Sequence, residues 1–314
     1  MITRRCFLAT SVSAITASLL SEAVPLFGGT TPNIQFPTQP RERIAIASYP
    51  FRDFIDLPPG EKPEGPQHPR IPLKDFPAHV ISKFNVNKVE LWTGHFPSAE
   101  QSYLRELRQA LDKAKAKVVN LAVDGEHSPY SPDAEERKKA IAFSKQWIDA
   151  ATFLGSPSVR TNLPDAKGAA PDLNVMAGSL TQVVEYAASK NVVVHLENDN
   201  PISEDPFFLV KLVEKVNSPW LHTLPDFCNS LTAKPAQYAY DGVNAMFSHA
   251  YGMCHVKAME NDRDGKPVHV DMARTFGFLK QHGYKGFCSM EYDSPGDPYA
   301  GTSELIETTL KFLA

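Results

Sequence analysis

Four polar residues in the C-terminal half of this 314-residue chain recur at nearly regular intervals. They are Glu197, Asp226, His255 and Glu291, and successive members are 29, 29 and 36 residues apart. Glu197 closes the apolar run 191–197, and an unpaired buried carboxylate is costly, so a compensating partner is expected. Three carboxylates and one imidazole that meet at one point need a cation between them. These ligand types suit one divalent ion, Mn²⁺ or Mg²⁺, with Co²⁺ or Zn²⁺ as alternatives.

The spacing of the four residues matches the repeat of a closed α/β barrel. A barrel of roughly 250 residues with eight βα units advances about 31 residues per unit and returns to the same rim each time. Short β-rich runs alternate with helical patterns along this chain. The runs cover residues 43–49, 87–92, 117–123, 158–162, 191–197, 220–226, 253–258 and 286–292. The pattern predicts an α/β fold, a single-domain (β/α)8 TIM barrel over residues 43–314, with the four residues at the C-terminal ends of consecutive strands.

The helical segment 132–154 shows how such a unit reads in sequence. Ile141 and Ile148 lie on one apolar stripe, whereas the charged residues near the start of the segment face water. Ser131 and Pro132 are suited to the N-cap and the first helical position, so the helix is predicted to begin there.

A Pro-rich stretch, residues 57–72, follows the first predicted strand. In a barrel it would lie on the catalytic face as a loop or lid. A surface excursion without a role is the alternative interpretation.

The first 23 residues have the features of an export signal. They start with basic residues, continue with an apolar and small-residue stretch, and end in Ser-Glu-Ala, a cleavage-like sequence. Arg4 and Arg5 lie in a stretch that resembles the twin-arginine motif, which directs export of already folded proteins. We therefore expect a signal peptide over residues 1–23, a linker over 24–42 and a periplasmic mature protein. An ordinary secretory signal that contains two arginines is the alternative.

Composition excludes some partners. The formal charge is −4 and the chain has no Lys/Arg-rich stretch, so nucleic acid is not an expected partner. The signal is too short to span a membrane stably, so no stable membrane anchor is expected. After the signal, the remaining cysteines are Cys228, Cys254 and Cys288, which we interpret as packing residues, with a disulfide as the alternative. The sequence leaves the oligomeric state open.

With these residues placed, the chain resembles the xylose-isomerase-like TIM barrel superfamily, often described as sugar phosphate isomerases/epimerases. The resemblance covers most of residues 43–313. It rests on VELW at 89–92, VHLEN at 194–198, LPDFCN at 224–229, HVK at 255–257, YKG at 284–286 and SMEY at 289–292. It implies that Glu197, Asp226, His255 and Glu291 bind one divalent ion. Asn198 matches the family pattern, whereas Asp199 departs from it.

The resemblance and the strand order together predict the chemistry. Glu197 and Glu291 would approach a bound substrate from different sides, so one can remove the proton α to a carbonyl and the other can return one. This predicts a metal-dependent isomerase or epimerase of a ketose or related carbohydrate, a small-molecule substrate without phosphate. Lys257 would hydrogen-bond a substrate oxygen or stabilise the enediolate; its alternative role is a salt bridge to a ligand carboxylate.

Further strand-end and loop residues are candidates for substrate binding. Those expected to bind sugar hydroxyls are Glu90, Asn162, Asn198 and Arg263, with Arg52 and His95 as additional candidates. Trp92 and Phe51 would stack on a sugar ring or, alternatively, pack in the core. His195 and His222 are expected in the core or behind the metal ligands.

Three other functions stay open at this point. A lyase or dehydratase acting on a 3-keto sugar or glycoside would use the same metal and bases. A non-catalytic sugar-binding barrel would not need two bases, yet both glutamates are present. A metal-dependent apurinic endonuclease of similar fold is disfavoured by the export signal, the acidic composition and the single strand-end histidine.

Overall fold

A computed structural model describes residues 31–62 and 68–314, so the expected signal peptide lies outside the described residues. Eight parallel strands form one sheet in the order β6-β5-β4-β3-β2-β1-β10-β7. Two isolated parallel bridges, Thr223–Ala250 and Asp226–His255, join β6 to β7 and bring the sheet close to full closure. The strands are β1 (Ile44–Ala47), β2 (Lys88–Trp92), β3 (Lys117–Val123), β4 (Ser158–Thr161), β5 (Val193–Glu197), β6 (Leu221–Leu224), β7 (Met253–Val256) and β10 (Phe287–Met290). The predicted TIM barrel is confirmed.

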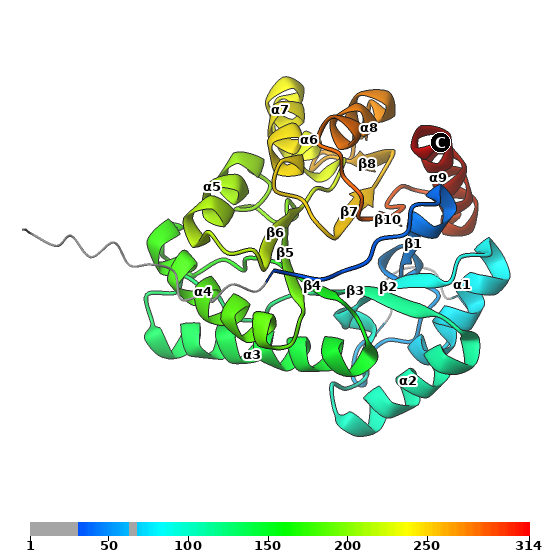
Figure 1. Cartoon of the computed structure of the whole chain (residues 1–314), viewed down its shortest axis with the longest axis horizontal. Helices are drawn as coiled ribbons and strands as arrows, with labels where there is room; N and C mark the ends of the chain where they lie inside the picture. The colour runs from blue at the N-terminus through cyan, green and yellow to red at the C-terminus, as the bar shows by residue number, and fades with distance from the viewer. Residues whose placement is uncertain (1–30, 63–67) are drawn as a thin grey trace, which may run out of the picture.

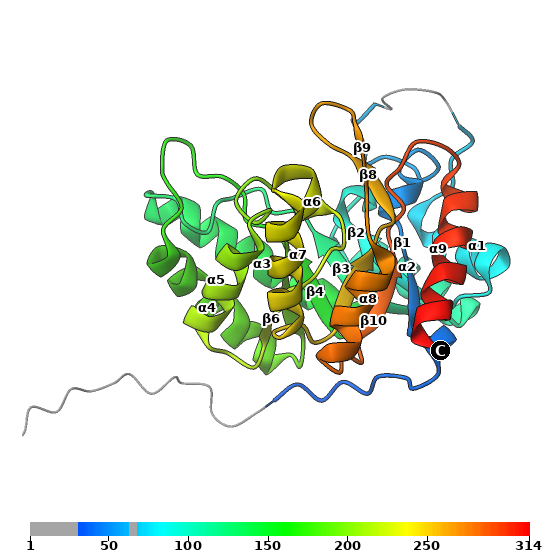
Figure 2. The same ribbon diagram turned by 90° about the horizontal axis from the view of Figure 1, so that it is seen from above.

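Helices between the strands form the outer layer around this sheet (Figure 1). They are α1 (Phe76–Phe84), α2 (Gln101–Ala114), α3 (Ala134–Leu154), α4 (Leu173–Ser189), α5 (Pro206–Val216), α6 (Asn229–Ala233), α7 (Ala236–Phe247), α8 (Met272–Gln281) and α9 (Pro298–Leu313). Short 3-10 turns are η1 (Pro40–Arg43), η2 (Tyr49–Phe51), η3 (Leu73–Asp75) and η4 (Thr93–His95). A small hairpin of β8 (Met259–Asn261) and β9 (Pro267–His269) follows β7 and projects beyond the barrel (Figure 2). Among the described residues, none of the helices has the length and apolar character needed to cross a membrane.

Helix α3 begins two residues later than predicted. Its N-cap is Asp133, whose carboxylate accepts a hydrogen bond from the backbone N–H of Glu135 at 2.9 Å. Ser131 instead accepts a hydrogen bond from the Asp133 backbone N–H at 3.2 Å. A carboxylate at the N-cap also interacts favourably with the helix dipole, which explains why Asp133 takes the position. The predicted stripe with Ile141 and Ile148 is buried as expected.

The described part of the expected linker, residues 31–39, packs against the barrel at the N-terminal ends of its strands. Phe36 makes edge-to-face contacts with Tyr251 and Phe287, at centroid distances of 5.3 and 5.7 Å. The Tyr251 hydroxyl donates to the carbonyl of Pro32 at 3.1 Å. Phe287 and Met253, which also pack with Phe36, are the first residues of their strands. Residues 31–39 therefore cover the N-terminal ends of the strands, opposite the rim that holds the four candidate ligands (Figure 2).

The C-terminal end of the Pro-rich stretch 57–72 pairs with the segment that follows β1. Ile71 forms a parallel bridge to Ile55, and Arg70 donates to the carbonyl of Ile55 at 2.6 Å. The stretch therefore emerges on the same rim as the candidate ligands, as predicted.

The three cysteines outside the signal, Cys228, Cys254 and Cys288, are free and buried, which confirms that they are packing residues.

Candidate metal centre

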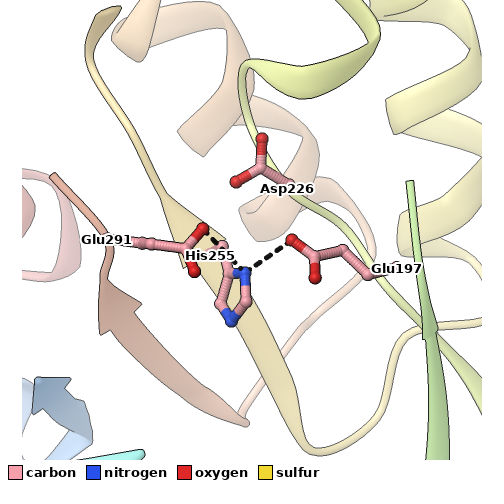
Figure 3. A group of neighbouring side chains, drawn as sticks. All are labelled: Glu197, Asp226, His255 and Glu291. Carbon is pink, nitrogen blue, oxygen red and sulfur yellow. Dashed lines mark hydrogen bonds and ion pairs between the residues drawn. The ribbon is translucent and has the colours of Figure 1, made fainter. Parts of the chain in front are cut away.

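The four residues singled out by spacing meet at one point on the barrel rim (Figure 3). One ligand atom from each of Glu197, Asp226, His255 and Glu291 lies within 4.8 Å of the others, and all four side chains are buried. Glu197 is the last residue of β5, and Glu291 follows directly after β10. His255 lies within β7, and Asp226, two residues after β6, faces it across the parallel bridge. Successive βα units thus bring residues 94 positions apart into one cluster.

The imidazole of His255 is oriented by carboxylates on both sides. Its Nδ1 lies 2.7 Å from Glu197 Oε1 and 3.1 Å from Glu291 Oε2, whereas its Nε2 lies 2.9 Å from Glu90 Oε2. Burial alone would lower the pKa of His255, but the negative charges of Glu197, Glu291 and Glu90 raise it well above its usual value. Binding of an ion would displace the proton on Nδ1, so that a neutral ring donates through Nε2–H to Glu90 and turns its Nδ1 lone pair toward the cluster, as in a metal-ligating histidine.

Asp226 offers an oxygen that fits a cation. Its Oδ1 accepts hydrogen bonds from the backbone N–H groups of Cys228 and Asn229, at 2.8 and 2.7 Å. Its Oδ2 is buried, has no hydrogen-bond partner among the described residues, and lies 3.7 Å from Lys257 Nζ. Burial raises the pKa of Asp226 to about 7, even though Lys257 lowers it. A buried carboxylate oxygen without a donor, beside three other ligand atoms, is suited to a bound ion.

Arg160 on β4 is a site residue that sequence reasoning missed. Its guanidinium is buried, with Nε 2.8 Å from Glu197 Oε2 and Nη1 2.5 Å from Asp124 Oδ1. Trp92 Nε1 donates to the other oxygen of Asp124 at 2.6 Å. The two oxygens of Glu197 thus face different cations, Oε1 toward His255 and Oε2 toward Arg160. A signal was present in the sequence, because an arginine within an apolar strand is rarely buried without a carboxylate partner.

Lys257 lies beside the candidate metal ligands, in the salt bridge expected as its alternative role. Its ammonium is buried and contacts Asn229 Oδ1 at 2.8 Å, Glu291 Oε2 at 3.2 Å and Glu260 Oε2 at 3.3 Å. The predicted salt bridge to a candidate metal ligand is therefore formed. Burial lowers the pKa of Lys257, but the surrounding carboxylates, with Asp226 the largest contributor, raise it well above the usual value. Lys257 is thus a fixed positive charge at the wall of the site.

A cavity of about 180 Å³ opens above the cluster, and its wall is strongly acidic. Acidic lining residues far outnumber Arg160 and Lys257, so the cavity disfavours phosphorylated or otherwise anionic ligands. Asp199 is part of this wall, and burial together with the charge of Glu197 raises its pKa to about 7. The lining residues are Tyr49, Trp92, Asp124, Arg160, Glu197, Asp199, Glu204, Asn229, Thr232, Lys257, Glu260, Glu291 and Asp293.

The four residues predicted to bind substrate hydroxyls lie outside the lining of this cavity. Glu90 is buried and bonds to His255. Asn198 is buried and pairs with the backbone of Asp226, donating to its carbonyl at 3.1 Å and accepting from its N–H at 2.8 Å. These two side chains hold candidate metal ligands in place, because hydrogen bonds to His255 and Asp226 occupy their polar groups.

The remaining two candidates lie farther from the cluster. Asn162 accepts a hydrogen bond from the backbone N–H of Gly125 at 2.7 Å. Arg263, in the turn between β8 and β9, is exposed and pairs with Glu204 at 2.7 Å. Glu204 lines the cavity, so Arg263 contacts a residue of the cavity wall but does not line the cavity itself.

Other aromatic and histidine candidates divide between cavity and core. Trp92 lines the cavity, whereas Phe51 is buried in the core. His195 is fully buried one layer below Glu197, and burial lowers its pKa well below the usual value. The ring nitrogens of His222 lie 3.1 Å from the carbonyl oxygen of His249 and 3.0 Å from that of Pro219, in the segments that precede β7 and β6. The prediction of a core position or one behind the ligands thus holds for His195, whereas His222 is half-buried at the N-terminal end of the barrel.

An eight-stranded parallel barrel with a Glu-Asp-His-Glu cluster at its C-terminal rim defines the class of this protein: a TIM barrel with a candidate site for one metal ion. The sequence matches the family model described as "Xylose isomerase-like TIM barrel" over residues 79–314, which is most of the chain. The chain therefore belongs to the xylose isomerase-like TIM barrel family. A search of curated protein sequences finds no match.

Solved structures with the same fold include three with informative descriptions. A xylose isomerase-like TIM barrel protein from Mycobacterium smegmatis in complex with magnesium is 17% identical, with a TM-score of 0.63 over 86% of this chain and 97% of that chain. D-psicose 3-epimerase with D-tagatose from Clostridium cellulolyticum H10 is 14% identical, with a TM-score of 0.61 over 86% and 96%. The probable 3-DHS dehydratase AsbF from Bacillus anthracis is 15% identical, with a TM-score of 0.60 over 83% and 97%. At these identities the likeness concerns the fold.

Proposed function

We propose that this protein is a divalent-metal-dependent isomerase or epimerase that transfers a proton α to the carbonyl of a ketose or related neutral carbohydrate. The observation that carries the proposal is the placement of two glutamates, Glu197 and Glu291, on either side of His255 in one acidic cavity. An ion held by the four-residue cluster, Mn²⁺ or Mg²⁺, would act as a Lewis acid on a neighbouring carbonyl and hydroxyl. The magnesium complex of a structural neighbour supports this choice of metal.

Side chains of the protein would remove the proton from the substrate and return it. Glu197 and Glu291 both line the cavity, so each can face one side of a bound sugar, and each lies beside a cationic side chain, Arg160 for Glu197 and Lys257 for Glu291. Positioned acid–base groups typically contribute about 10²- to 10⁴-fold in rate. Lys257 would donate a hydrogen bond to the oxygen on which negative charge develops. Return of the proton to the opposite face gives epimerisation, and return to the neighbouring carbon gives isomerisation.

A lyase or dehydratase acting on a 3-keto sugar or glycoside is the second candidate. The same proton removal, followed by loss of a β-leaving group, gives elimination. The buried ammonium of Lys257, 3.2 Å from Glu291 Oε2, is compatible with this alternative because it could donate a hydrogen bond that stabilises negative charge on a leaving oxygen. A dehydratase among the structural neighbours shows that the fold accommodates such a reaction.

Deuterium exchange distinguishes these reactions. The metal-loaded protein would be incubated in D₂O with a panel of ketoses and 3-keto-glycosides, and the products followed by NMR. Deuterium incorporated without loss of water or an aglycone supports the isomerase or epimerase, whereas an unsaturated product supports the lyase. Exchange that is undiminished in Glu197→Gln would show that Glu197 is not a base. A sugar that binds without exchange or turnover would identify a binding protein instead.

We further propose that the mature protein works in the periplasm after export by the twin-arginine route. The proposal rests on Arg4 and Arg5 and on the signal-like composition of residues 1–23. That route carries folded proteins, so a metal acquired before export could remain bound.

A further inference from the structure

A second cavity adjoins the metal centre on the side of β1 and β10. It measures about 370 Å³, compared with about 180 Å³ for the cavity above the cluster. Its walls come from the segments that follow these two strands, and Asp293 lines both cavities. The two hollows are therefore neighbours on the same rim.

Three side chains form the boundary between the cavities. Arg52 Nη2 donates to Asp293 Oδ1 at 2.8 Å, and the Arg52 guanidinium lies over the ring of Tyr49, 4.5 Å from its centroid. Tyr49 lines the first cavity and Arg52 the second. Arg52 is about two-fifths exposed, so this boundary consists of partly solvated side chains rather than backbone.

The volumes bear on the size of the ligand. Small-molecule sites typically occupy about 300 to 1,000 Å³. The cavity above the cluster falls below this range by itself, whereas the two cavities together fall within it. A ligand that uses the whole site is therefore longer than one that fits above the cluster alone.

The wall of the second cavity has the chemistry of a carbohydrate subsite. Tyr292 supplies an aromatic ring on which the C–H face of a pyranose can pack, and Phe54, whose ring stacks on His68 with centroids 4.5 Å apart, adds apolar surface. Asp53 and Ser294 add groups that exchange hydrogen bonds with hydroxyls. The lining carboxylates outnumber Arg52, so a neutral ring is favoured over an acidic one.

We propose that this second cavity is a subsite for a second pyranose ring, so that the substrate is a neutral glycoside whose first ring lies at the metal centre. The proposal rests on the proposed function for the role of the first cavity. Binding to the subsite is nevertheless measurable without turnover.

The test uses the mature protein loaded with Mn²⁺. Dissociation constants for maltose, cellobiose and trehalose would be measured by ligand-observed NMR and compared with that of methyl glucoside, which has one ring. Paramagnetic broadening by Mn²⁺ reports which ring of a bound disaccharide lies nearer the ion. Two tryptophan variants form a matched pair: Asp53→Trp fills the subsite at a half-exposed position, and Lys113→Trp, at an exposed position on α2 outside the lining of both cavities, leaves it open.

At least one disaccharide is expected to bind about tenfold more tightly than methyl glucoside, with one ring broadened more than the other. Asp53→Trp should remove most of that preference, and Lys113→Trp should keep it. The proposal is overturned if no disaccharide binds better than methyl glucoside, or if both variants keep the preference equally. Turnover separates the two proposals: a disaccharide preference without proton exchange on any ketose refutes the proposed reaction alone, and exchange without a preference refutes the subsite alone.

Discussion

The two oxygens of Asp226 have different surroundings, and the difference explains how this residue serves a cation site. Backbone N–H groups fix Oδ1, whereas Oδ2 is buried without a donor among the described residues. The two oxygens of Glu197 also have different partners, since Oε1 lies toward His255 and Oε2 toward Arg160. Each carboxylate thus presents one oriented oxygen to the centre of the cluster.

Metal content tests this arrangement directly. After incubation with Mn²⁺ or Mg²⁺ and removal of free ions, the wild-type protein is expected to retain about one ion per chain. Glu291→Ala should retain far less, because it removes one of four ligands. Elemental analysis by mass spectrometry gives the stoichiometry, and Glu304→Ala, an exposed position on α9, is the control. A wild-type protein without bound ion, or equal ion content in Glu291→Ala, would contradict the metal centre.

The role of Arg160 can be tested through stability. In EDTA, Arg160→Met is expected to lower the free energy of unfolding by about 3–5 kcal/mol, because it leaves buried Glu197 without its positive partner. Added Mn²⁺ should restore part of the loss by supplying positive charge at the cluster.

Urea denaturation with and without Mn²⁺ measures both effects. Arg108→Met is the matched control, since Arg108 pairs with Asp112 on the surface of α2, where such a pair contributes little. An Arg160→Met protein as stable as this control in EDTA would argue against the buried pair.

At the scale of the elements, helix packing around the barrel explains one glycine. Gly242 on α7 lies against α5, and a Cβ there would lie 2.0 Å from Pro206 Cγ. Gly178 on α4 has open space around the same position. Both are helical glycines, so they differ in their packing rather than in their backbone conformation.

The two positions therefore predict opposite effects of the same substitution. Gly242→Ala should destabilise the protein by about 1–3 kcal/mol through overpacking. Gly178→Ala should stabilise it by about 0.5–1 kcal/mol, because alanine loses less conformational entropy in a helix. Thermal unfolding of both variants provides the comparison, and a destabilised Gly178→Ala or an unaffected Gly242→Ala would refute the packing argument.

For the whole molecule, the described N-terminal segment lies on the face opposite the metal centre (Figure 2). Phe36 packs against the first residues of β7 and β10, so residues 31–39 lie away from the cavity above the candidate ligands.

The proposed export route makes a specific prediction. Substitution of both Arg4 and Arg5 by lysine should prevent export by the twin-arginine route, so uncleaved protein accumulates in the cytoplasm. Cell fractionation followed by intact-mass measurement detects the outcome, and Arg105→Lys serves as a control outside the signal. Continued appearance of mature protein in the periplasm would favour the ordinary secretory route.

The sequence by itself determined the barrel and its four candidate ligands. Both follow from a repeat, since a βα unit of nearly constant length returns each strand end to the same rim. It also marked Glu90 and Asn198 as polar residues of the site, but assigned them to substrate rather than to His255 and Asp226. Spacing shows that residues converge, but not which of two neighbouring groups a side chain contacts.

Only the tertiary structure decided which side chains of neighbouring strands contact each other and where the loops after the strands meet. Arg160 is opposite His195 in the register of β4 and β5, yet its guanidinium reaches Glu197, two residues further along. Alternation places Arg160 on the same face as both His195 and Glu197, but it does not determine which of them a long arginine side chain contacts. The second cavity likewise arises where the segments after β1 and β10 meet, far apart in sequence and adjacent because the barrel closes there.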